Sequence, residues 1–84
     1  MRLDKYLKIS RLIKRRTVAN EAASLGRITV NGKVAKPSAE VKPGDELSLR
    51  LGARTLRVRV LSTPETAPKA DASALYTVLE GEAE

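Results

Sequence analysis

The chain of 84 residues is long enough for one domain and too short to bury a large core. It contains no cysteine and no histidine, which excludes disulfide bonds, thiolate chemistry, a histidine-based catalytic triad and a histidine or cysteine zinc site. Lysine and arginine number 16 against 10 aspartates and glutamates, which gives a net charge of +6. We therefore expect a basic, non-enzymatic domain without a metal or cofactor.

The charge is unevenly distributed along the chain. Residues 1–36 hold ten basic and two acidic residues, whereas residues 62–84 hold one basic and five acidic residues. A strongly basic segment favours a polyanionic partner. The apolar runs are too short to span a bilayer and the N-terminus lacks the apolar core of a signal peptide, so we expect a cytoplasmic protein with no membrane partner.

Two short helices are predicted in the basic half. Residues 2–13 place apolar side chains at the spacing of one helix face, and residues 16–25 repeat such a face with alanines that make it narrow. Gly26 stands where a left-handed C-terminal cap belongs. We expect a tight join near residues 10–15, with Ser10 and Thr17 as local capping groups.

The hydrophobic period changes to two after Gly26. In "RITVNGKVA" the pair Asn31–Gly32 separates alternating apolar residues, which is the strongest short signal for a hairpin. A Pro43–Gly44–Asp45 turn follows, and alternation then predicts strands near 47–51 and 55–61, the second with a basic outer face. The predicted fold class is α+β, with two N-terminal helices packed on a small, twisted, mostly antiparallel sheet.

The segment "RLIKRR" carries four positive charges in six residues. Only Asp4 and Glu21 are acidic within residues 1–36, so internal ion pairs should not neutralise it. On a continuous helix Arg11 and Arg15 would share a face. A phosphate would satisfy both the arginines and the free N–H groups at the start of the second helix. The alternative is a solvated, solubilising face, and the density of the charge favours phosphate binding.

The scarcity of aromatic residues restricts how a nucleic acid could be recognised. Phenylalanine and tryptophan are absent, and Tyr6 fits the core better than the surface. Stacking of single-stranded bases needs exposed rings, so we expect a folded duplex or stem-loop to be recognised by shape. The adjacent carboxylates Asp45 and Glu46 are interpreted as turn residues and not as a catalytic pair.

Several of these motifs, taken in sequence order, resemble the motif pattern of one protein family. The set comprises Arg2-Leu3-Asp4, Arg16 with Ala19 and Gly26, Val30-Asn31-Gly32 and Pro43-Gly44-Asp45. They resemble the RNA-binding domain named after the fourth protein of the small ribosomal subunit, also called the αL motif. The resemblance covers residues 2 to about 49 and departs at Arg15, where that family more often has serine.

Among the free-standing members, the chain is most similar to a group that serves bacterial ribosome-associated quality control. The resemblance implies a non-enzymatic, monomeric factor that binds large-subunit rRNA and peptidyl-tRNA on obstructed large subunits. It would stabilise the P-site tRNA while a separate alanine-tailing factor extends the stalled chain. Two alternatives remain within RNA binding: a heat-shock-type factor that recycles free large subunits with trapped nascent chains, and the RNA-binding module of a modifying enzyme. A third is a module that docks on an acidic protein. The short acidic C-terminal end favours the quality-control group.

Nine cationic side chains are candidates for RNA contact, in three groups. Two match the RNA-contacting arginines of the family: Arg2 and Arg16. Four are chosen by charge: Lys5, Arg11, Lys14 and Arg15. Three flank the hairpin, where phosphate contact and solvation remain equal alternatives: Arg27, Lys33 and Lys36.

We assign the RNA-binding domain to residues 1–61. Residues 62–84 contain Pro64 and Pro68 and few large apolar side chains. We therefore expect a linker there, followed by an edge strand at 75–79 and an acidic tail.

Overall fold

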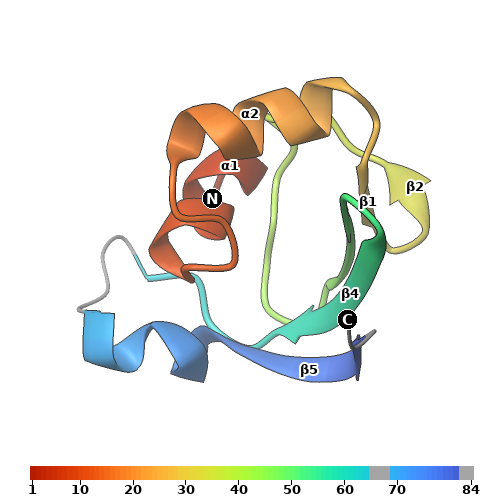
Figure 1. Ribbon diagram of the computed structural model, residues 1–84. Coiled ribbons are helices and arrows are strands. Elements are labelled where there is room, and N and C mark those ends of the chain that lie inside the picture. Colours follow the sequence, from red (N-terminus) through yellow and green to blue (C-terminus); the bar gives the residue numbers. More distant parts are fainter. Residues whose placement is uncertain (65–68, 82–84) are drawn as a thin grey trace.

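The computed structural model describes residues 1–64 and 69–81 (Figure 1). The helices are α1 (Leu3–Ile9), α2 (Arg16–Ser24) and the 3-10 helix η1 (Lys69–Leu75). The strands are β1 (Ile28–Val30), β2 (Lys33–Val34), β3 (Glu46–Leu51), β4 (Arg54–Val60) and β5 (Tyr76–Gly81). None of the helices in the described residues has the length and apolar content of a membrane span.

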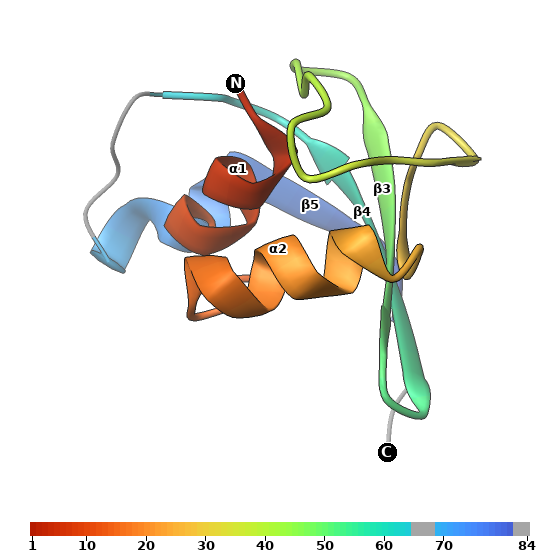
Figure 2. The ribbon, with the colours of Figure 1, turned by 90° about the horizontal axis from the view of Figure 1, so that it is seen from above.

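The five strands form one sheet in the order β2-β1-β3-β4-β5, and every neighbouring pair is antiparallel. Figure 2 shows α1 and α2 on the same side of β3 and β4. The buried residues of β3, Leu47 and Leu49, face the helices, while the residues between them face the other side. These two layers confirm the predicted α+β class, in which helices cover one face of an antiparallel sheet.

The join between the helices contains a sharp break at Arg11. This residue has φ +62°, a left-handed conformation, and α1 therefore cannot continue through it. The predicted join near residues 10–15 is thus confirmed, and Arg11 and Arg15 do not lie on one continuous helix. The hydroxyl of Ser10 donates to the Leu7 carbonyl oxygen and so acts as a local cap at the end of α1. In contrast, α2 begins after Arg15 without a side-chain cap, so the capping role expected of Thr17 is wrong.

Helix α2 ends in a Schellman motif, in agreement with the left-handed cap predicted at Gly26. Gly26 has φ +75°, its N–H donates to the Ala23 carbonyl, and the Arg27 N–H donates to the Ala22 carbonyl. The chain then enters β1 and turns at Asn31–Gly32, where φ is +53° and +84°. Positive φ at both positions gives the predicted two-residue hairpin.

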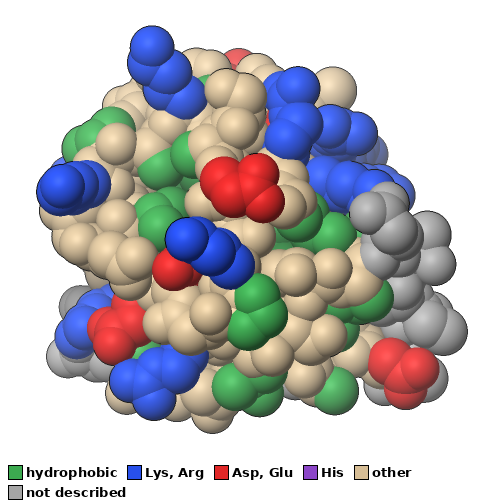
Figure 3. All heavy atoms as spheres, turned by 180° about the vertical axis from the view of Figure 1, so that it is seen from behind, with side chains coloured by type: hydrophobic (Ala, Val, Ile, Leu, Met, Phe, Trp, Pro, Cys, Tyr) green, Lys and Arg blue, Asp and Glu red, His purple; other side chains and the backbone are tan. Residues whose placement is uncertain are grey.

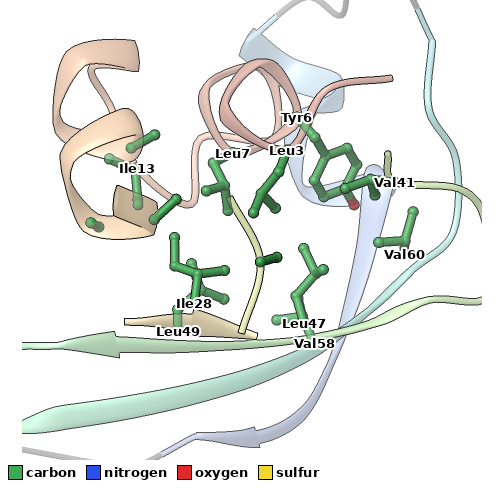
Figure 4. Packing of buried hydrophobic residues seen from close by; sticks show 14 of the residues in the cluster. Leu3, Tyr6, Leu7, Ile13, Ile28, Val41, Leu47, Leu49, Val58 and Val60 are labelled. Atoms are coloured by element: carbon green, nitrogen blue, oxygen red, sulfur yellow. The ribbon is translucent and has the colours of Figure 1, made fainter. Parts of the chain in front are cut away.

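The core lies between α1 and the inner face of the sheet. Leu3, Tyr6 and Leu7 of α1 are fully buried. Figure 4 shows Leu3 and Leu7 pointing toward the sheet, where Ile28 and Leu47 lie, and Tyr6 beside Val41. Each such side chain contributes roughly 1.5–3 kcal/mol through its burial. The alanine face of α2 is also buried, as the spacing predicted, through Ala19, Ala22 and Ala23. Small side chains let α2 lie close to α1, which fixes the relative position of the two basic helices.

The C-terminal part of the chain differs from the predicted linker. A strand, β5, does lie where an edge strand was expected, although it spans Tyr76–Gly81. The preceding residues 69–75 form η1, with Ala72 and Leu75 buried. The expectation of a loose linker is therefore wrong for residues 69–74, and residue 75, expected in the edge strand, ends η1 instead. Residues 65–68 and the end of the expected tail, 82–84, lie outside the described residues.

One carbonyl oxygen connects this C-terminal part to α1. The Leu75 carbonyl accepts hydrogen bonds from the Tyr6 hydroxyl at 2.7 Å and from the N–H groups of Leu61 and Ser62 at 2.8 and 3.3 Å. Burial raises the pKa of Tyr6 above its usual value, which keeps the phenol protonated as a donor. The first helix and the last strand are thereby held against each other.

Tyr6→Phe should lower the free energy of unfolding by about 0.5–1.5 kcal/mol, because it removes one buried hydrogen bond and little apolar area. Urea unfolding would measure the change. Tyr76→Phe is the matched control, since Tyr76 is only half-buried and its hydroxyl makes no hydrogen bond within the described residues. Equal losses in the two variants would contradict a specific role for the Tyr6 hydroxyl.

Candidate RNA-binding surface

The start of α1 is held by the loop that precedes β3. The Leu3 N–H donates to the Ala39 carbonyl at 2.8 Å and the Asp4 N–H to the Pro37 carbonyl at 3.1 Å. Arg2 forms an isolated antiparallel bridge with Glu40. These contacts satisfy the first N–H groups of α1 with protein carbonyls and fix the position of Asp4.

Asp4 is the centre of the cationic surface. Its side chain is only 3% exposed and lies between α1 and α2. Arg2 approaches both carboxylate oxygens, with Nε at 3.2 Å from Oδ1 and Nη2 at 3.2 Å from Oδ2. Arg16 places Nη2 at 3.4 Å from Oδ1, and Asn20 Nδ2 lies 3.5 Å from Oδ2. The Lys5 N–H also donates to Oδ1, at 2.8 Å. One carboxylate therefore organises groups from both helices.

The surroundings of Asp4 keep it ionised. Burial acts to raise the pKa of its carboxyl, but the hydrogen bonds from Arg2 and Asn20, the charge of Arg16 and the Lys5 N–H together hold this pKa below the ordinary value of 3.8. A buried carboxylate would be costly without such partners. The five donors make the charged form stable at neutral pH.

The pairing corrects one expectation from the sequence. Arg2 and Arg16, which seemed to lack internal partners, share a single aspartate. Because one negative charge faces two positive ones, a net positive charge remains. The two guanidinium side chains are still 53% and 48% exposed, and a guanidinium carries five N–H donors. Asp4 thus orders the two arginines while leaving donors available to an anion.

A surface depression beside this carboxylate is lined by Asp4, Arg16, Thr17 and Asn20. Counting charges missed the positioning roles of Asp4 and Asn20. Their signal in the sequence is indirect: Asn20 follows Arg16 by one helical turn, so both side chains lie on one face of α2. The depression offers donors and a buried, paired carboxylate, which suits it to bind an anion and gives it no free general base.

The join between the helices adds three exposed cations next to this site. Its anchor is Ile13, which is buried and donates its N–H to the Leu7 carbonyl at 3.1 Å. The flanking side chains of Arg11, Lys14 and Arg15 are exposed and form no ion pair within residues 1–64 and 69–81. Figure 3, which views the molecule from behind, shows several lysine and arginine side chains gathered at one edge of that face. Lys5, on α1, is half-buried.

The structure does not bring all nine candidates together. Lys36 is adjacent to Pro37, whose carbonyl accepts from the Asp4 N–H, and so lies near the Asp4 site. Arg27 follows the opposite end of α2, and Lys33 lies in the hairpin. The nine residues of α2 span about 13 Å, which separates these two cations from Arg16.

Two helices on one face of an antiparallel sheet, with two half-exposed arginines ordered around one carboxylate, form a small α+β domain with a cationic surface, and residues 1–47 match the S4 domain family. The chain is 54% identical over 82 residues to the RQC P-site tRNA stabilizing factor of Bacillus subtilis (strain 168). The aligned residues cover 98% of this chain and 95% of that protein. The chain belongs to the family of these P-site tRNA stabilizing factors.

Proteins of the heat-shock type are also similar. Heat shock protein 15 of Escherichia coli (strain K12) is 37% identical over 78 residues, which is 90% of this chain and 58% of that protein. The trimeric structure of heat shock protein 15 from Vibrio cholerae matches with a TM-score of 0.85 and 30% identity, over 93% of this chain and 80% of that one. The resemblance predicted from the sequence is confirmed at the level of family and fold.

Asp4→Asn should lower the free energy of unfolding at pH 7 by about 1–3 kcal/mol, because two arginines and one asparagine lose a charged acceptor. The folded-state pKa of Asp4 is lowered, so its contribution is fully present above pH 3.8 and is lost as the pH falls through that folded pKa. Urea unfolding at pH 7 and near pH 3 would therefore show a difference between the wild type and Asp4→Asn that shrinks in acid. Glu21→Gln removes an exposed carboxylate on α2 and serves as the control. A constant difference at both pH values would contradict the role of the charge.

Proposed function

We propose that this protein is a non-enzymatic RNA-binding factor of bacterial ribosome-associated quality control, and so acts in the cytoplasm. It binds large-subunit rRNA and peptidyl-tRNA on obstructed large subunits and stabilises the P-site tRNA during C-terminal alanine tailing. The observation that carries the proposal is the pair of half-exposed arginines, Arg2 and Arg16, held by the buried Asp4. The name of the relative from Bacillus subtilis supplies the P-site tRNA as the ligand.

The geometry favours contact with the phosphate and 2′-hydroxyl groups of folded RNA. Tyr6 is fully buried and bonded to the Leu75 carbonyl, and Tyr76 is half-buried, so neither tyrosine offers a stacking platform. Exposed guanidiniums instead match the bidentate geometry of phosphate oxygens. A stem-loop or tRNA presents such phosphates in a fixed shape, which two ordered arginines can recognise.

Two further parts of the proposal concern partners. The alanine-tailing factor is expected on the same obstructed subunit, where a stabilised P-site tRNA would be its substrate. We expect this protein to act there as a monomer, although the related protein from Vibrio cholerae is described as trimeric.

A heat-shock-type role in recycling free large subunits with trapped nascent chains is the second candidate. The close match to the fold of heat shock protein 15 favours it. The two roles differ in their ligand: the first requires a tRNA in the P site, and the second requires only the free subunit with its nascent chain. Binding to large subunits prepared with and without peptidyl-tRNA separates them.

Arg2→Ala and Arg16→Ala should each weaken association with large subunits, because each removes one of the two guanidiniums ordered by Asp4. Stability should also fall, by about 0.2–1 kcal/mol, since Asp4 retains only the other arginine. Co-sedimentation and urea unfolding measure the two effects, with Arg16→Lys as the variant that keeps the charge but loses the planar fork.

Lys42→Ala is the matched control, because Lys42 is exposed in the loop before β3 and its side chain makes no ion pair within the described residues. It should co-sediment like the wild type. If folded Arg16→Ala also co-sediments like the wild type, the site is wrongly assigned. If association survives nuclease digestion of the RNA, the ligand is a protein.

Association should weaken steeply with salt. With five to seven phosphates engaged, the log–log slope of the binding constant against salt should be about −0.7 to −0.9 per phosphate. A titration of binding to large subunits over a series of potassium chloride concentrations measures the slope. A slope near zero would rule out phosphate contact as the main source of affinity.

A further inference from the structure

The face of the sheet that carries no helix is basic as well. Residues between the buried positions of the strands point to this outer face. Four arginines occupy it: Arg27, Arg50, Arg57 and Arg59. Glu46 lies on the same face, and the register of β5 pairs Glu80 with Arg57. Sequence alternation identified the arginines of β4 and did not single out Arg50.

Two of these arginines already have an internal partner. Arg57 Nη2 lies 3.1 Å from Glu46 Oε1, and Arg59 Nη2 lies 3.1 Å from Glu46 Oε2. The hydrogen bond from Arg59, together with the charges of both arginines, holds the pKa of Glu46 below its usual value. One end of the outer face is thus locally compensated.

The other end lacks such compensation. The Arg50 N–H donates to the Arg27 carbonyl at 2.9 Å, and the register of β1 on β3, with Ile28 opposite Leu49, places Arg27 opposite Arg50. Their Cα atoms are therefore only about 5.5 Å apart. Like charges directly opposite each other destabilise a sheet. Neither side chain forms an ion pair within residues 1–64 and 69–81.

The same two arginines line one surface depression, together with Leu25, Gly26 and Gly52. Gly26 and Gly52 have φ of +75° and +65°, and a Cβ at Gly52 would meet no atom within 4 Å. The wall of the depression is therefore open to an approaching group. Two unpaired guanidiniums beside an open backbone suit a phosphate, which can accept hydrogen bonds from both.

We propose that Arg27 and Arg50 form a second phosphate-binding site, which holds the backbone of an RNA against the outer face of the sheet. This inference rests on the proposed function and deepens it, because the Asp4 site lies on the helix layer and this one on the face without helices (Figure 2). A small domain with two such faces can contact two RNA segments at once. Arg27 then belongs to this second site and not to the helix face.

The test compares Arg50→Gln, Arg16→Gln and Lys42→Gln, which each remove one positive charge. Binding to purified large subunits, with and without a P-site tRNA, is measured over a potassium chloride series. Arg50→Gln should make the salt slope shallower by about 0.7–0.9 in at least one preparation, since one phosphate contact is lost. The preparation in which this happens shows whether the phosphate belongs to rRNA or tRNA. Lys42→Gln should leave the slope unchanged, because Lys42 precedes the start of β3 whereas Arg50 lies near its end.

Thermal unfolding of the free protein gives a second readout. Because Arg27 and Arg50 repel each other, Arg50→Gln should keep or raise the melting temperature at low salt while it weakens binding. If Arg50→Gln binds like Lys42→Gln in both preparations while Arg16→Gln binds weakly, the second site is refuted and the proposed function stands. If Arg16→Gln also binds normally, both fail. If the contribution of Arg50 survives nuclease digestion, its ligand is a protein and the proposed site is wrong.

Discussion

The carboxylate of Asp4 joins the start of α1 to the first turns of α2, and the geometry of the cationic surface depends on that contact. An ionised group this deeply buried is tolerated only because five donors surround it. The arrangement solves a problem common to polyanion-binding surfaces, in which cations must lie close together before the ligand arrives. Asp4 lowers their mutual repulsion and restricts their side-chain freedom, so that less order has to be imposed on binding.

Local signals predicted much of the fold. Gly26 and Asn31–Gly32 require positive φ, and alternation defined β3 and β4, so these features follow from a few neighbouring residues. The 3-10 helix η1 was not predicted because its sequence consists mainly of small residues. Its last carbonyl, that of Leu75, accepts a hydrogen bond from Tyr6, 69 residues earlier, and Leu75 is buried in the core. Elements that are stabilised mainly by distant packing leave little trace in local composition.

The sequence predicted the basic composition of the candidate surface better than the arrangement of its side chains. Charge density directed attention to the N-terminal half, but counting charges cannot tell which cations share a carboxylate or a face. The break at Arg11, the separation of Arg27 from Arg16 by the length of α2, and the cross-strand pairing of Arg27 with Arg50 all depend on backbone conformation and strand register. Register in particular is a tertiary property, since it is set by which faces of the strands are buried.

The carbonyl of Leu75, bonded to the Tyr6 hydroxyl and to the chain just after β4, also affects how the protein is made. The first helix lacks this partner until residue 75 has been synthesised. Contacts between such distant positions form late, because the intervening loop must close first. During translation the basic N-terminal segment therefore leaves the ribosome well before the residue that completes its packing has been added.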